Sequence, residues 1–194
     1  MRTLVLYCHP NPASFVAAAR DRVLAGLTAS GHEVRLTDLY ADGFRPEISR
    51  AEHRVHLEPG VASELDPYVA DLRWAEALVL VYPTWWSGQP AMLKGWIDRV
   101  WGCGVAWELR EGTSVVRPLL TDLRRIAIVT THGSSKFVNA LEGESGKRTA
   151  FRSIRAVCSR RARTSWIAIY GLDRTDNAAR VAWLDEVEAR FRRF

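Results

Sequence analysis

The chain has 194 residues, of which 47% are hydrophobic and 25% are charged, and its formal net charge is +5. These proportions exclude an intrinsically disordered chain, which carries few apolar residues and a high net charge. The length is typical of one domain, so we expect a single domain over residues 1–194. Three cysteines without C-x-x-C spacing exclude a disulfide framework and a thiolate zinc site, and we expect no bound metal.

The first residues do not resemble a targeting or membrane segment. The apolar stretch at 4–8 is too short for the core of a signal peptide, and no stretch approaches the roughly 20 apolar residues of a membrane span. We therefore expect a cytoplasmic protein without an integral membrane segment. The positive net charge favours anionic partners, but it does not distinguish nucleic acid, lipid headgroups and phosphate-bearing small molecules.

Apolar runs of strand length alternate with segments of helical periodicity. In chain order the pattern predicts a strand at 4–8, a helix at 15–30, a strand at 34–39, a helix at 65–75, a strand at 77–82, a helix at 92–101, a strand at 126–129, a helix at 151–158, a strand at 166–170 and a helix at 181–191. Because parallel strands need crossover helices, this alternation predicts an α/β fold whose parallel sheet has helices on both faces.

Three loops are candidates for binding, because ligands of such sheets lie beyond the carboxyl ends of the strands. They are 8–14, 83–90 and 130–146. The first leads into a helix, whose N-terminal N–H groups suit a phosphate. Ser14 either donates to that phosphate or only caps the helix, and the sequence leaves both open. The loop matches neither the P-loop nor the Rossmann glycine pattern.

The second and third loops contain residues suited to a planar ligand. Trp85 and Trp86 are adjacent between Pro83 and Pro90, and their rings either line a flat aromatic site or cover the edge of the core or a subunit contact. In the third loop His132 precedes a glycine, whose backbone can approach a planar ligand closely.

The run from Tyr82 to Val100, YPTWWSGQPAMLKGWIDRV, resembles the signature of the flavodoxin-like NAD(P)H:quinone oxidoreductase family. The loop from His9 to Phe15, the TTHGS run at 130–134 and the spacing of the strands agree, so the resemblance covers nearly the whole chain. It implies a doubly wound sheet of five parallel strands in the order 2-1-3-4-5, a tightly bound flavin, and a homodimer with its active site at the subunit interface.

The resemblance also implies which residues contact the flavin, which we expect to be FAD, with FMN as the alternative. They are His9, Ser14 and Phe15 towards the phosphates and adenosine, Pro83, Thr84, Trp85, Trp86 and Ser87 beside the ring, and Thr131, His132, Gly133 and Ser134 from the third loop. The chain departs from the family's animal members after the glycine-rich loop. Those members have a tyrosine and then a histidine proposed to relay charge, whereas residues 137–145 contain neither.

By this resemblance the protein is an NAD(P)H:quinone oxidoreductase with ping-pong kinetics. Hydride passes from NAD(P)H to the flavin and then to a quinone-like acceptor, which takes the place that the nicotinamide has left. We expect backbone N–H groups of 84–87 and 131–134 to stabilise negative charge on the reduced ring. No catalytic side chain is assigned, and His132 is the candidate to test.

Two other functions remain open. The chain also resembles flavodoxin-like regulatory subunits of potassium efflux systems, which share the fold and the flavin. A nucleic-acid-binding function would use the basic residues Arg148, Arg152, Arg155, Arg160, Arg161 and Arg163. Helical spacing instead places Arg148, Arg152 and Arg155 on an ordinary solvated face, so we expect no nucleic-acid partner.

The helix at 92–101 predicts the homodimer interface. Its apolar residues spread over two adjoining faces, with Lys94, Asp98 and Arg99 expected to turn away, so a monomer would expose much apolar surface. A symmetric dimer would cover it. The alternative is a monomer in which the loop at 102–125 folds back over the second face.

Overall fold

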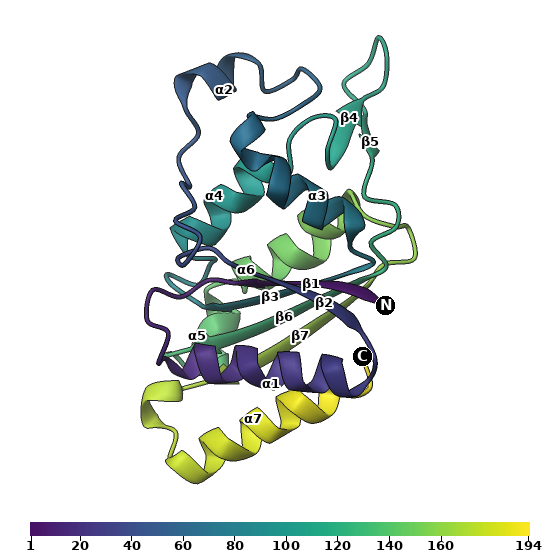
Figure 1. Ribbon diagram of the computed structural model, residues 1–194. Coiled ribbons are helices and arrows are strands. Elements are labelled where there is room, and N and C mark those ends of the chain that lie inside the picture. The colour runs from purple at the N-terminus through teal and green to yellow at the C-terminus, as the bar shows by residue number, and fades with distance from the viewer.

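A five-stranded parallel sheet crosses the middle of the protein in the computed structural model, which describes residues 1–194 (Figure 1). Its strands are β1 (Arg2–Tyr7), β2 (Glu33–Asp38), β3 (Ala77–Pro83), β6 (Arg125–His132) and β7 (Arg163–Tyr170). They lie in the order β2-β1-β3-β6-β7, and every pairing is parallel. The predicted flavodoxin-like fold and its strand order are therefore confirmed.

Helices cover both faces of this sheet. On one face lie α1 (Phe15–Ala29) and α7 (Asn177–Phe191), and on the other α3 (Asp66–Trp74), α4 (Ala91–Val100), α6 (Ser145–Arg148) and the π-helical η2 (Thr149–Ile154) (Figure 1). All seven residues of β3 are buried, because this strand is central and covered on both sides. The helix predicted at 151–158 begins earlier, as α6, and passes through the π-helical turns.

Several short elements were not predicted from periodicity. They are α2 (Arg50–Arg54), η1 (Ser63–Leu65), α5 (Lys136–Leu141), η3 (Leu172–Arg174) and an antiparallel hairpin of β4 (Trp107–Leu109) with β5 (Val116–Pro118). Local caps start two of them: Ser49 and Glu52 form a capping box at α2, and Ser135 caps α5 by accepting from the Val138 N–H. No helix has the length and apolar character needed to cross a membrane.

The prediction that a monomer would expose the second apolar face of the 92–101 helix is wrong. Trp96 and Trp101 are only 1% and 7% exposed. The 40–49 segment packs so closely on α4 that a Cβ added to Gly95 would lie 2.3 Å from Pro46. On the other side the chain folds back, and the Trp107 indole N–H donates to the Trp101 carbonyl at 2.9 Å. The protein's own loops therefore cover this helix.

Arg99 was expected to turn to solvent with Lys94 and Asp98, and this too is wrong. Its side chain is 4% exposed, and its Nε donates to Glu52 Oε1 at 2.8 Å. A second ion pair joins it to Glu64. The helical pattern could not show this, because both carboxylates lie in segments far earlier in the chain that fold over α4.

Candidate functional site

The loops that follow β1, β3 and β6 meet because these strands are parallel neighbours and end at the same edge of the sheet. The Thr84 N–H donates to the Thr131 carbonyl at 2.9 Å, and the Thr84 and Thr130 hydroxyls are also 2.9 Å apart. The His9 ring lies 6.4 Å from that of Trp85, between ring centroids. The structure thus brings the three predicted loops together.

The tryptophan loop forms a tight two-residue turn. Trp85 and Gly88 exchange backbone hydrogen bonds of 3.2 and 3.1 Å, and the two residues between them have left-handed φ angles, 49° at Trp86 and 58° at Ser87. Such angles are uncommon for residues with a side chain and require support from their surroundings. Trp86 is fully exposed, so the alternative in which its ring covers the core edge within the protomer is wrong.

Residues 142–146 supply that support. The Ser145 hydroxyl donates to the Ser87 carbonyl at 2.6 Å, and the Gly146 N–H donates to the same oxygen at 3.2 Å. The Ser87 hydroxyl in turn donates to the Glu142 carboxylate. The Ser87 carbonyl and hydroxyl are therefore both fixed by the segment after α5.

His132 is a buried imidazole at the end of β6. It is 5% exposed and stacks on Tyr170 with ring centroids 4.6 Å apart and planes 17° apart. Nε2 lies 3.4 Å from the Thr84 hydroxyl, and Nδ1 has no hydrogen-bond partner in the protein. Burial lowers the pKa of His132 below its ordinary value, so the neutral ring is favoured.

A concavity of about 370 Å³ lies between the second and third loops. The predicted site residues that line it are Thr84, Trp85, Trp86, Ser87, His132, Gly133 and Ser134. Two further residues, Asn139 in α5 and Glu142 at its C-cap, were missed, although their i, i+3 spacing could have placed them on one side of a helix. The Asn139 amide donates to the Ser134 hydroxyl at 2.8 Å and so holds the third loop.

The remaining predicted site residues do not line this concavity. Pro83 and Thr131 are buried at the ends of their strands. Ser14 caps α1 by accepting from the Ala17 N–H at 3.1 Å, and the His9 Nδ1 accepts from the Asn11 N–H at 3.0 Å. The Phe15 ring packs against Trp183 of α7, 5.6 Å between centroids. Within the protein these three residues shape the first loop and the start of α1.

The backbone donors at the concavity are free. The N–H groups of Trp86, Ser87, Gly133 and Ser134 donate to no protein atom, whereas those of Thr84 and Trp85 are bonded within the loops. Because these donors border the concavity and are not used within the protein, they are suited to the polar edge of a ligand.

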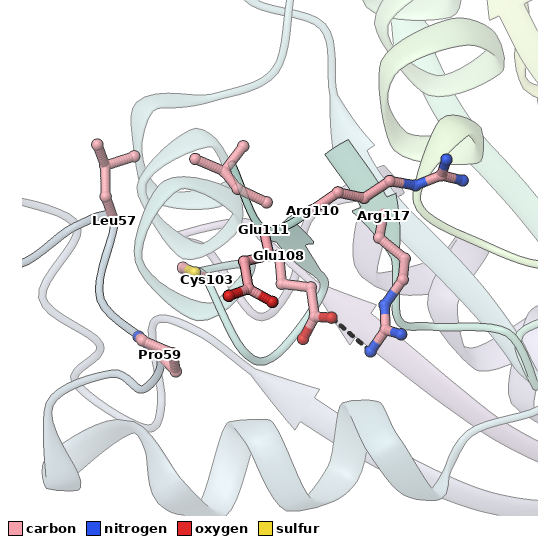
Figure 2. Close-up of a pocket in the computed structure, with 8 residues that line it drawn as sticks. Leu57, Pro59, Cys103, Glu108, Arg110, Glu111 and Arg117 are labelled. Atoms are coloured by element: carbon pink, nitrogen blue, oxygen red, sulfur yellow. Dashed lines mark ion pairs between the residues drawn. The ribbon is translucent and has the colours of Figure 1, made fainter. Parts of the chain in front are cut away.

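Another cavity, of about 680 Å³, lies far from these loops, between residues 57–59 and the β4–β5 hairpin (Figure 2). Glu108 and Arg117 form an ion pair across the hairpin, and Cys103 lies at its base. None of the predicted site residues lines it. The candidate site is therefore the concavity at the carboxyl edge of the sheet.

The basic segment from the end of α6 to β7 has its arginines at the surface, as expected for a solvated face. Arg148, Arg152 and Arg155 are exposed. The Arg155 Nε donates to the Ala162 carbonyl at 2.8 Å, which closes the turn before β7. The sequence expectation that these residues face solvent is confirmed.

Residues 1–191 match the model of a family described by its flavodoxin-like fold. The chain belongs to this family. Among solved structures, Smu.1420 from Streptococcus mutans is 27% identical with a TM-score of 0.88 and full coverage of both chains. An NAD(P)H:quinone oxidoreductase from Methanothermobacter marburgensis is 25% identical with a TM-score of 0.81, over 99% of this chain and 96% of that one.

Curated relatives point to the same group of proteins. A ribosyldihydronicotinamide dehydrogenase-like protein, traD, from Penicillium crustosum is 30% identical over 72% of this chain and 61% of its own length. The rat NAD(P)H dehydrogenase [quinone] 1 is 31% identical over 75% of this chain and 58% of its own length. The chain therefore spans about six-tenths of the length of these relatives.

Proposed function

We propose that the protein is a flavin-dependent NAD(P)H oxidoreductase that reduces a quinone-like acceptor by ping-pong turnover. The observation that carries the proposal is the set of four free backbone N–H groups, from Trp86, Ser87, Gly133 and Ser134, around a concavity walled by two tryptophans. Planar aromatic walls and converging backbone donors fit a ring that is flat and has a polar edge. The family membership of the chain agrees with this.

The residues present fit a flavin, FAD or FMN. When bound, a flavin supplies reversible acceptance of a hydride, chemistry that no amino-acid side chain provides. His132 adds an unpartnered ring nitrogen, and the 15-residue helix α1 directs its N-terminus towards the same edge of the sheet. Gly133 has no side chain, so the backbone of this wall can be approached closely by a ligand.

In this proposal the protein's own residues bind the flavin, orient its ring and shield it. The free N–H groups stabilise negative charge on the polar edge of the bound ring, because preorganised donors need no rearrangement as charge develops. The neutral His132 ring is held in position by its stacking on Tyr170 and its contact with the Thr84 hydroxyl, and it is the side chain to test for a role in proton transfer. The exposed Trp86 ring offers a flat apolar surface at the rim of the concavity, beside which a planar ligand can pack.

We further propose a homodimer in which each partner closes the other's site. The support is exposed apolar surface that the protomer does not cover: Trp86 is fully exposed, and Phe137 and Leu141 on α5 are each 72% exposed. Large apolar side chains left exposed on the loop and helix that border the concavity are suited to an association surface.

The proposed function can be tested on the purified protein. We expect a yellow protein whose released cofactor is identified by mass spectrometry, and oxidation of NADH or NADPH that depends on an added quinone such as menadione. Parallel double-reciprocal plots would support ping-pong turnover. A protein that retains neither FMN nor FAD after incubation with each, and that does not oxidise NAD(P)H, would overturn the proposal.

A further inference from the structure

Arginine side chains gather at the opposite edge of the sheet, where β6 and β7 begin. Arg125 and Arg163 are the first residues of these strands and are register partners, so their side chains leave the sheet side by side on one face. Arg190, in the last turn of α7, and Arg193, two residues beyond its end, lie beside them. This arginine cluster lies about 23 Å, the length of the eight residues of β6, from the concavity at the carboxyl edge of the sheet, which we call the flavin-type concavity.

Three of these guanidinium groups have no carboxylate partner. Arg190 pairs with Glu186, but Arg125, Arg163 and Arg193 form no ion pair in the protein. Arg125 lies over the Phe194 ring at 5.3 Å, and the Arg193 Nε donates to the Ala189 carbonyl at 3.2 Å. Like charges directly opposite on neighbouring strands are destabilising. The structure therefore bears an uncompensated positive charge here, which a bound anion would offset.

These arginines surround a cavity of about 560 Å³. Beside it α7 packs closely against α1, since a Cβ added to Gly26 of α1 would lie 2.6 Å from the Glu188 carbonyl of α7. Arg163 and Ser165 of β7, the edge strand, are exposed. Ile167 and Phe191 form an apolar floor.

We propose that this cavity binds a phosphate-bearing anion, independently of the flavin-type concavity. A guanidinium presents several N–H groups in a planar fork that matches phosphate oxygens, and arginine is the residue best suited to such recognition. Three unpaired guanidiniums, two from neighbouring strands and one from the chain after α7, suit a group with several negative charges, such as a polyphosphate or a phosphate monoester, better than a single carboxylate. The volume is within the range of small-molecule sites.

The experiment is calorimetric titration of the purified protein with sodium tripolyphosphate at constant ionic strength. The test variants are Arg163→Gln and Arg193→Gln, and the matched control is Arg152→Gln, which removes an exposed arginine of η2 outside the cavity. We expect saturable binding that each test variant weakens about tenfold or more, since each removes a charge-assisted hydrogen-bond donor. The control should change the affinity by less than about twofold.

A parallel measurement distinguishes a free phosphate from a lipid headgroup as the bound anion. Sedimentation with phosphatidylcholine vesicles, with and without phosphatidic acid, uses the same three variants. The site is supported if either assay shows binding that is lost in the test variants and kept in Arg152→Gln. The assay in which this happens identifies whether the bound anion is a free phosphate or a lipid headgroup. Absence of binding in both assays, or equal losses in test and control variants, overturns the proposal.

Discussion

The Ser145 hydroxyl donates to the Ser87 carbonyl at 2.6 Å, and this bond joins two segments 58 residues apart in the chain. Ser87 and Trp86 both have left-handed φ angles, and a non-glycine residue in that conformation costs on the order of 1 to 3 kcal/mol. Bonds from Ser145 and Gly146 to one carbonyl help to offset that cost. The segment after α5 thereby fixes the turn that presents the Trp86 and Ser87 N–H groups.

Ser145→Ala should loosen this turn. We expect a loss of about 1 kcal/mol in the free energy of unfolding, typical of one hydrogen bond, together with several-fold weaker flavin retention. Urea unfolding and fluorescence titration with FMN and FAD measure the two effects. Ser153→Ala is the matched control, because Ser153 is exposed on η2 and its hydroxyl makes no hydrogen bond in the protein. Equal flavin affinity in both variants would show that the turn does not depend on Ser145.

Trp86→Ala should separate binding from folding. The ring is fully exposed, so its removal should change stability by no more than about 0.5 kcal/mol, as for other surface substitutions. Quinone turnover or flavin retention should fall strongly if the ring faces the ligand. Trp96→Ala is the contrast: that ring is 1% exposed, and its loss should cost about 3 to 5 kcal/mol. A Trp86 variant that unfolds as easily as the Trp96 variant would contradict the placement of Trp86.

The sequence could predict the sheet and the edge at which its loops meet, because buried parallel strands are continuous apolar runs and their order follows from the family. It could not predict the β4–β5 hairpin, whose three-residue strands lie partly exposed and carry no periodic signal. The same holds for the turn at Trp86 and Ser87. Its geometry depends on Ser145 and Gly146, and no local pattern relates residues that far apart.

Arg99→Ala should destabilise the protein by roughly 2 to 3 kcal/mol. The guanidinium is 4% exposed between Glu52 and Glu64, and removing one member of a buried ion pair typically costs about 3 to 5 kcal/mol. The smaller figure applies because solvent screens Glu64, whose side chain is 58% exposed. Lys94→Ala, which breaks the exposed pair with Asp98 on the same helix, should cost about 0.3 to 0.5 kcal/mol. Similar midpoints of urea unfolding for the two variants would disprove a structural role for Arg99.

His132 should make stability fall as the pH is lowered. Burial holds its folded-state pKa below 6.5, so the unfolded chain takes up a proton at a pH where the folded protein does not. This contribution is fully present above about pH 6.5 and is lost progressively down to the lower folded-state pKa. Urea unfolding at pH 7.5 and 5.5 should show a smaller decrease for His132→Asn than for the wild type. His32, whose pKa burial also lowers, should maintain part of the decrease in the variant.

The proposed dimer predicts a mass of about twice 21.9 kDa by light scattering at micromolar concentration. Trp101→Glu is not a clean test, because Trp101 is buried within the protomer and a charge there would disturb folding. Phe137→Glu is better, since Phe137 is 72% exposed on α5 and belongs to the apolar surface on which the dimer is proposed. We expect this variant to have the mass of a protomer and to lose quinone turnover. Val181→Glu, at an exposed position of α7, should keep the doubled mass and the activity. A wild-type mass near 21.9 kDa with full activity would show that each site is complete without a partner.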